Sequence, residues 1–216
     1  QNDDLWLEIA VDGEESPALA APVRYFFPGL EQGKNYQNFV VLSKHGFVNR
    51  LAIPYTQGIS FSVVNRGRRA VKDLELTVAW DPSYRVDDGP RGSLHGCFLR
   101  ESQADVLFPI PVRLVGIVCA EHPDQPDGPV HFGLEFDDPG VSTLSWEGRG
   151  EMLGLAVGAK EVRQTLNGRS GGLAWRWWLL GPPEIKGLIQ ETAATLGDRM
   201  IYYYAPRGAV PVALPE

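Results

Sequence analysis

The stretch Ile59-Ser-Phe-Ser-Val-Val-Asn65 alternates apolar and polar residues, and after the break at Asn65-Arg66-Gly67 the alternation returns in Leu74-Glu-Leu-Thr-Val-Ala-Trp80. A period of two places successive side chains on opposite faces, which is typical of a β-strand with one buried face. Asn and Gly in the break favour a chain reversal because they tolerate positive φ. The two stretches therefore predict two strands separated by a reversal.

The same short alternating or apolar runs recur along the whole chain between turn-rich breaks. The other predicted strands are Leu5–Val11, Ala18–Phe27, Phe39–Ser43, Phe47–Tyr55, Ser93–Arg100, Val112–Ala120, Pro129–Phe136, Ser142–Trp146, Glu151–Val157, Ala174–Leu180, Lys186–Glu191 and Met200–Tyr204. The best helix candidate, Ile185–Leu196, contains Gly187 and several β-branched residues, so we expect it to be mostly strand. The 24 glycines and 17 prolines leave little room for long helices.

Many short strands at about ten-residue spacing predict an all-β protein, an antiparallel jelly-roll β-sandwich. We expect one unit over residues 1–216. A Pro-Ile-Pro break within Phe108–Pro111 marks an alternative lobe boundary near residues 103–110, which would give two packed jelly-roll lobes.

Composition restricts the partners. The 216 residues carry 20 basic and 27 acidic side chains, a net charge of −7, which argues against a nucleic-acid groove because phosphate binding needs clustered Lys and Arg. No apolar run reaches the roughly 18 residues that span a bilayer, so we expect no membrane insertion. The chain begins at Gln1, as expected of a fragment or of a chain whose signal peptide has been removed. Localisation stays open, and an extracellular or virion surface fits this pattern.

The two cysteines, Cys97 and Cys119, are too few for a disulfide scaffold. We expect two buried free thiols, and the alternative is one disulfide in an oxidising compartment.

Aromatic clusters supply the candidate contact residues. In the strand that contains Trp175, Trp177 and Trp178, at least one indole faces opposite its neighbour, which predicts one core ring and one surface ring. A surface Trp stacks on a sugar ring or fills a subunit interface, and the alternative is an ordinary core. The runs Tyr25-Phe26-Phe27 and Tyr202-Tyr203-Tyr204 are flat aromatic faces that oligomerisation would bury.

Several segments resemble, in the same order, those of glycoside hydrolase family 172, a jelly-roll family of fructofuranosidases and arabinofuranosidases. The likeness covers about two thirds of the chain. The segments that carry it are Leu7–Phe27 with its Asp-Gly-Glu, Leu51–Tyr55 followed by Ile59–Asn65, His95–Glu101, Trp146–Gly154, Trp175–Pro183 and Ile201–Tyr204. The resemblance implies a jelly-roll fold and a trimeric assembly.

One departure from that family concerns its chemistry. Family members carry their acid/base and nucleophile glutamates in a Trp-Gly-Glu-Gly-Asp type stretch and a Gly-Thr-Gly-Thr-Glu-Asp-Tyr type stretch, where this chain has only the short link Gly158–Ala174. Glu161 is the only carboxylate in that link. A retaining glycosidase needs two carboxyl groups about 5–5.5 Å apart. The resemblance therefore implies a protein with the fold of the family but without its catalytic activity.

Carboxylates also cluster at Glu135/Asp137/Asp138, Asp87/Asp88 and Glu147/Glu151, and a pair that faces a cleft would act as acid and base or bind calcium. The stretch Asp137–Gly140 is more economically a turn, since Asp caps its own backbone there, and His122–Gly128 a solvated loop. The remaining histidines lack metal-ligand spacing, so no metal, cofactor or catalytic residue is predicted.

The function predicted from the sequence is a non-catalytic jelly-roll subunit of a coat, shell or capsid-like homo-oligomer, a trimer or a multiple of it. Two alternatives stay open. One is a glycoside hydrolase acting on fructofuranosides or arabinofuranosides, and the other is a carbohydrate-binding module that uses the Trp-rich strand.

Overall fold

The structure is a computed structural model. It describes the backbone of residues 3–28, 40–43, 46–81, 92–100, 106–121, 130–136, 143–148, 152–157, 162–170, 172–180, 184–191, 196–206 and 212–213, and the side chains of residues 3–28, 47–81, 92–100, 106–120, 172–177 and 197–206.

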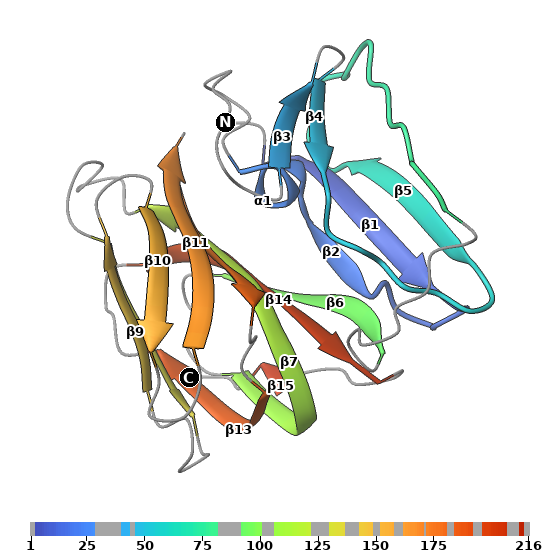
Figure 1. The fold of residues 1–216 in the computed structure, drawn as a ribbon. Coiled ribbons are helices and arrows are strands. Elements are labelled where there is room, and N and C mark those ends of the chain that lie inside the picture. Colours follow the sequence, from blue (N-terminus) through green and yellow to red (C-terminus); the bar gives the residue numbers. More distant parts are fainter. Residues whose placement is uncertain are drawn as a thin grey trace.

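The described elements are antiparallel strands apart from the four-residue helix α1 (Val23–Phe26), which confirms the all-β prediction (Figure 1). A three-stranded sheet has the order β2 (Leu19–Pro22), β1 (Leu5–Val11), β5 (Ile59–Asn65). The strands β3 (Val40–Ser43) and β4 (Gly46–Asn49) form a separate pair.

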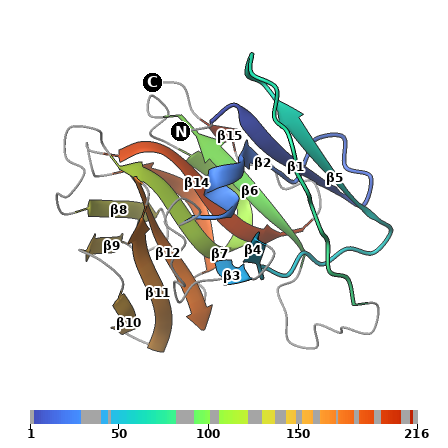
Figure 2. The same ribbon diagram turned by 90° about the horizontal axis from the view of Figure 1, so that it is seen from above.

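The remaining strands form one ten-stranded sheet. They are β6 (Ser93–Leu99), β7 (Val106–Glu121), β8 (Val130–Phe136), β9 (Thr143–Gly148), β10 (Met152–Val157), β11 (Val162–Ser170), β12 (Leu173–Leu180), β13 (Glu184–Glu191), β14 (Leu196–Ala205) and β15 (Val212–Ala213). Its main order is β10-β11-β12-β7-β13-β8-β9, with β14 pairing with both β6 and β7, and β15 pairing with β7. In Figures 1 and 2, β6 and β14 lie between the three-stranded sheet and β10–β12.

Two predicted strands end earlier than the alternation indicated. The stretch predicted as Ala18–Phe27 becomes β2 and then α1, because Pro22 lacks the N–H that would continue the ladder. The stretch predicted as Phe47–Tyr55 is strand only up to Asn49. The Asn49 side chain there donates to the Phe26 carbonyl at 2.7 Å and accepts from the Leu51 N–H at 2.8 Å, a local turn that replaces ladder bonds.

The Pro-Ile-Pro stretch lies inside β7, which runs unbroken through that part of the predicted lobe boundary, while residues 103–105 lie outside the described residues. The partner strand β13 shifts register there, with Ile185 opposite Val112 and Gly187 opposite Phe108. Pro109 and Pro111 have no N–H to donate, so the ladder skips them.

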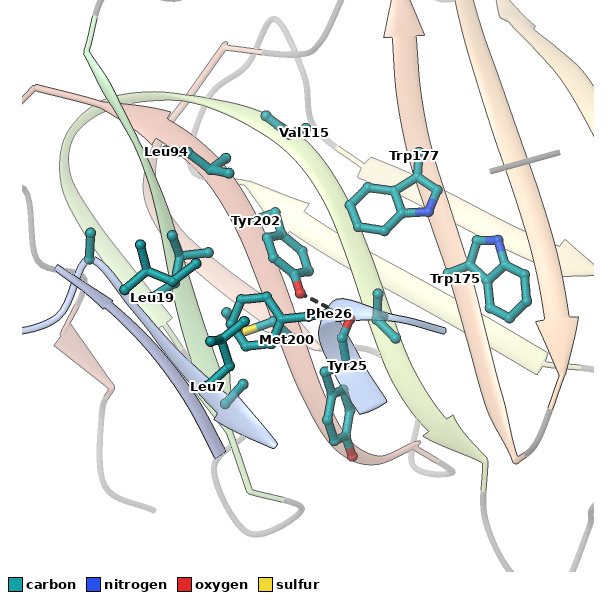
Figure 3. Close-up of a cluster of buried hydrophobic side chains, with 14 of the residues drawn as sticks. Leu7, Leu19, Tyr25, Phe26, Leu94, Val115, Trp175, Trp177, Met200 and Tyr202 are labelled. Atoms are coloured by element: carbon teal, nitrogen blue, oxygen red, sulfur yellow. Dashed lines mark hydrogen bonds between the residues drawn. The ribbon is translucent and has the colours of Figure 1, made fainter. Parts of the chain in front are cut away.

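One buried cluster joins the three-stranded sheet, α1 and the ten-stranded sheet (Figure 3). It includes Leu7 and Ile9 from β1, Leu19 from β2, Phe26 from α1, Val115 and Val118 from β7, Trp175 and Trp177 from β12, and Met200 and Tyr202 from β14. The hydroxyl of Tyr202 donates to the Tyr25 carbonyl at 2.9 Å, the dashed line in Figure 3. Aromatic burial of this size dominates core energetics, so the cluster is the main physical link between the two sheets.

The two thiols form no disulfide, and Cys119 is buried as predicted, whereas Cys97 is partly buried. Cys97 lies on β6 opposite Ile201 and Cys119 on β7 opposite Arg199, so β14 separates them. Strands lie about 4.8 Å apart, which places the two thiols two strand spacings from each other, beyond bonding reach. Burial raises the pKa of the Cys97 thiol to about 12, so it holds little reactive thiolate.

Candidate interaction site

The segment that follows β5, residues 66–81, is outside every described sheet, so the predicted strand over Leu74–Trp80 is wrong as a sheet member. The apolar side chains of this stretch, which the alternation predicted to be buried on one face of a sheet, are exposed. Leu74 is 52% exposed, Leu76 43%, Val78 48% and Trp80 68%. We call these four side chains the apolar strip. All of residues 68–81 are exposed, so the four apolar side chains of the strip are accessible to solvent.

The start of this segment is anchored to β1. The Arg66 N–H donates to the Asp4 carbonyl at 2.7 Å, its guanidinium pairs with Glu8 at 2.9 Å, and the same group lies 3.6 Å from the Trp6 ring centroid. The Asn65 side chain then closes the turn by donating to the Arg69 carbonyl at 2.7 Å. These contacts extend the β1–β5 ladder by one residue and fix where the segment leaves the sheet.

A groove with a volume of about 760 Å³ separates residues 76–81 from the core-facing side of the three-stranded sheet. Leu7 and Ile9 of β1 and Ile59 and Phe61 of β5 line its floor, and residues 48–49 and 51–55 form a second wall. Most of its lining is apolar, and Asn49, Thr77 and Asp81 add polar groups. Concave apolar sites with a few polar groups are the usual form of a binding site.

Asp12 holds the end of the second wall. Its buried carboxylate accepts from the Thr56 N–H at 2.8 Å and hydroxyl at 2.9 Å, from the Gln57 N–H, and from the Gly58 N–H at 3.0 Å. The Asp12 N–H donates back to the Gly58 carbonyl at 2.7 Å. Asp12 has φ +56° and the following Gly13 φ +74°, positive values that Asp and Gly tolerate in turns. One side chain thus fixes the loop that leads into β5.

Replacing Asp12 with Asn is expected to lower the free energy of unfolding by about 2–4 kcal/mol, because an amide donor replaces an acceptor facing buried N–H groups. Urea unfolding measures the change. The matched control is Asp73→Asn, since Asp73 has a nearly equal φ of +57° but is exposed. We expect the control to change stability by less than about 0.5 kcal/mol. Equal losses in the two variants would contradict the assigned role of Asp12.

The structure places four of the predicted contact aromatics in the core. Trp175, Trp177, Tyr202 and Tyr203 are at most 1% exposed. Their strands are internal to the ten-stranded sheet, since β12 lies between β11 and β7 and β14 between β6 and β7. In the structure these four rings are core residues, and not the exposed contact residues that were predicted.

The other predicted aromatics are placed as follows. Tyr25 and Phe26 are also buried, so the first aromatic run is not an exposed face. Tyr204 is partly buried, and its hydroxyl donates to the Ala52 carbonyl at 2.9 Å, beside the groove. Trp178 belongs to β12, and its side chain is outside the described side chains. A contact role for Tyr204 and Trp178 stays a prediction.

The sequence interpretation missed Trp80 and Tyr55 as site residues. Both line the groove, and Tyr55 is 38% exposed. The available signal was the alternation that ends at Trp80, which predicted a buried face without showing what buries it.

His95 is a buried titratable group outside the groove. It stacks on Tyr203 with ring centroids 5.7 Å apart, and its Nε2 lies 4.0 Å from Glu14. Burial lowers the pKa of His95 below its ordinary value of 6.5, and the nearby Glu14 carboxylate opposes that shift. In the folded protein His95 is therefore predominantly neutral near pH 7.

This placement predicts a loss of stability in mild acid. The unfolded chain binds a proton at His95 more readily than the folded chain, so the contribution of His95 is complete above pH 6.5 and falls as the pH drops below it. We expect His95→Gln to lose less stability than the wild-type chain between about pH 7.5 and pH 5.5. Urea midpoints across this range measure the difference, and identical pH dependence in the two chains would refute the role of His95.

Among the described residues, no group of three or more His, Cys, Asp or Glu side chains is arranged to hold a metal ion. Glu161, Glu151, Asp137/Asp138, Asp87/Asp88 and His122–Gly128 lie outside the described residues, and so do the side chains of Glu135 and Glu147. The prediction about catalytic carboxylates thus stays a prediction. Within the described ranges, no helix has the length and apolar character needed to cross a membrane.

Comparison with protein-family models gave no match, and comparison with curated proteins gave none either. The resemblance to glycoside hydrolase family 172 therefore depends on the quoted segments alone and remains a hypothesis about ancestry and fold.

Proposed function

We propose that this protein is a structural subunit of a homo-oligomer, a non-catalytic jelly-roll β-sandwich that works by assembling with further copies. The observation that carries the proposal is the apolar strip, Leu74, Leu76, Val78 and Trp80, four large apolar side chains exposed within seven consecutive residues. Contiguous apolar surface of this kind marks interaction sites in soluble proteins.

The sandwich part of the proposal is supported by the shared buried cluster. Side chains from β1 and β2 meet those from β7, β12 and β14 in that cluster, as expected of two sheets packed face to face. A sandwich of two packed sheets is a rigid scaffold that holds a surface contact in a fixed position. Such a scaffold suits a subunit with a structural role.

The location of the apolar side chains favours assembly over accidental exposure. The large apolar side chains exposed in the described part of the chain are Val48, Tyr55, Val71, Leu74, Leu76, Val78 and Trp80. Five of these seven lie within ten consecutive residues, whereas scattered single exposures need no explanation. Burying the strip against a neighbour would remove this surface from water, which stabilises association.

Multi-angle light scattering over a dilution series tests the proposed function. We expect a molar mass that is a multiple of 23.8 kDa at high concentration, three times that value for the proposed trimer, and a lower mass on dilution. A mass of 23.8 kDa at every concentration would refute assembly.

A carbohydrate-binding role is the second candidate, favoured by one observation. The exposed rings of Trp80 and Tyr55 line the same groove as the polar groups of Asn49 and Asp81. Aromatic rings stack on sugars, while polar groups bind the hydroxyls.

Quenching of tryptophan fluorescence by fructofuranosides or arabinofuranosides, lost in Trp80→Ala, would support this role. Leu74→Ala is the matched control, because Leu74 belongs to the strip but not to the groove lining. Sugars that leave the fluorescence unchanged would exclude the second candidate.

A further inference from the structure

We propose that Leu74–Trp80 of one copy adds as a fourth strand to the free edge of β5 in a neighbouring copy. This inference names the contact through which the proposed assembly forms, and it therefore rests on the proposed function. The occupant of the β5 edge is a second copy of this chain.

The acceptor is the outer edge of the three-stranded sheet. In the described part of the chain, β5 pairs with β1 on one side and with no strand on the other. The N–H and C=O groups along such an edge are a template for an added strand. Addition of an extended segment to a sheet edge is a common mode of recognition, in which main-chain hydrogen bonds give affinity and alternate side chains give specificity.

The donor is the segment that carries the apolar strip. Its sequence has the alternation of a strand, yet among the described residues it pairs with none. In the described part of the chain, the edge of β5 is paired with no further strand, and the strand-like segment is paired with no sheet. Two copies satisfy both when the segment of one pairs with the β5 edge of the other. A head-to-tail contact of this type forms a ring when the rotation between copies closes and an open filament when it does not, and the proposed trimer is the closed case with three copies.

The connection after β5 explains why the neighbour is the partner. Arg66 is held to Asp4, Glu8 and the Trp6 ring, and residues 76–81 lie across the groove from Ile59 and Phe61. In the structure this segment is not paired with β5 of its own chain. A strand from a neighbouring copy reaches the same edge with the connection intact.

The side chains define a register. In β5, Ile59, Phe61 and Val63 are half-buried on the core side, opposite Val11, Ile9 and Leu7 of β1, while Ser60 and Ser62 face solvent. Antiparallel addition that sets Val63 opposite Leu74 also sets Phe61 opposite Leu76 and Ile59 opposite Val78.

The same register also pairs the polar side chains on the solvent face of β5 with those of the added strand. Ser62 then lies opposite Glu75 and Ser60 opposite Thr77, so like charges do not meet. A shift by one residue would turn Glu75 and Thr77 toward the core side and the strip toward solvent. The alternation therefore determines which face of the added strand lies toward the core.

Disulfide trapping tests the contact at two exposed positions, Ser62 and Glu75. We would prepare Ser62→Cys and Glu75→Cys as separate chains, mix them, and oxidise with copper phenanthroline. The expected product is a disulfide-linked species of twice 23.8 kDa that forms in the mixture and not in either variant alone. The out-of-register control mixes Ser62→Cys with Ala79→Cys, also exposed but four residues further along the strand. The wild-type chain reports any background from Cys97 and Cys119.

A chain that carries both Ser62→Cys and Glu75→Cys separates the two possible partners of β5. An intrachain disulfide in a monomer would overturn the proposal, because it would show that the segment pairs with its own β5. Oligomers by light scattering, with equal trapping in the matched and control mixtures, would overturn the strand contact and leave the proposed function standing. A monomer at every concentration would overturn both.

Discussion

Replacing Trp177 with alanine is expected to lower the free energy of unfolding by about 3–5 kcal/mol, the range for removing a large aromatic side chain from a core. Trp177 is fully buried, and its ring centroid lies 5.2 Å from that of Tyr202. Both residues lie directly opposite Gly116, Trp177 from β12 and Tyr202 from β14. A Cβ at position 116 would come within 1.9 Å of the Trp177 ring, so the glycine provides the space that the ring fills.

Trp80→Ala is the matched control for that loss. It is the same substitution at a ring that is 68% exposed, and we expect it to change the stability of the monomer by less than about 0.5 kcal/mol. Urea unfolding at a concentration below the association range measures both variants. Similar losses at the two positions would contradict the assignment of Trp177 to the core and Trp80 to the surface.

Replacing Leu76 with Glu is expected to weaken self-association by at least about tenfold, since a buried Leu side chain contributes about 1.5–3 kcal/mol and a charge there is also desolvated. Leu76 lies in the middle of the apolar strip and lines the groove. The midpoint of the light-scattering dilution series measures the change.

Thr77→Glu is the control for charge. It adds the same negative charge to the same segment, at the position that the proposed register sets opposite Ser60 on the solvent face. We expect its association midpoint to stay close to that of the wild-type chain. Equal weakening by the two variants would indicate a general effect of charge and would refute a specific role for the strip.

The strands were predictable from sequence where the deciding information is local. Alternation in Ile59–Asn65 and the turn at Asp12-Gly13 depend on neighbouring residues, and both are found in the structure. The end of β2 at Pro22 is also local, because a proline cannot donate to the ladder, but the apolar run through Phe27 obscured it.

The candidate site was less predictable, because it depends on which faces the distant strands cover. The alternation around Trp177 predicts two faces, yet the packing of β1 and β2 decides that the face of Trp175 and Trp177 is buried. The pattern of Leu74–Trp80 equally predicts a buried face. No neighbouring residue in the sequence shows that this segment lacks a partner strand in its own chain.

The most direct test of the account is amide hydrogen exchange over residues 74–80 at several protein concentrations. If the apolar strip is the assembly contact, alternate N–H groups of this segment become protected as the concentration rises, because they enter a ladder with β5 of a neighbouring copy. Peptides from the core strand β12 should show concentration-independent protection. Rapid exchange of residues 74–80 at every concentration, in a sample that light scattering shows to be assembled, would contradict the account.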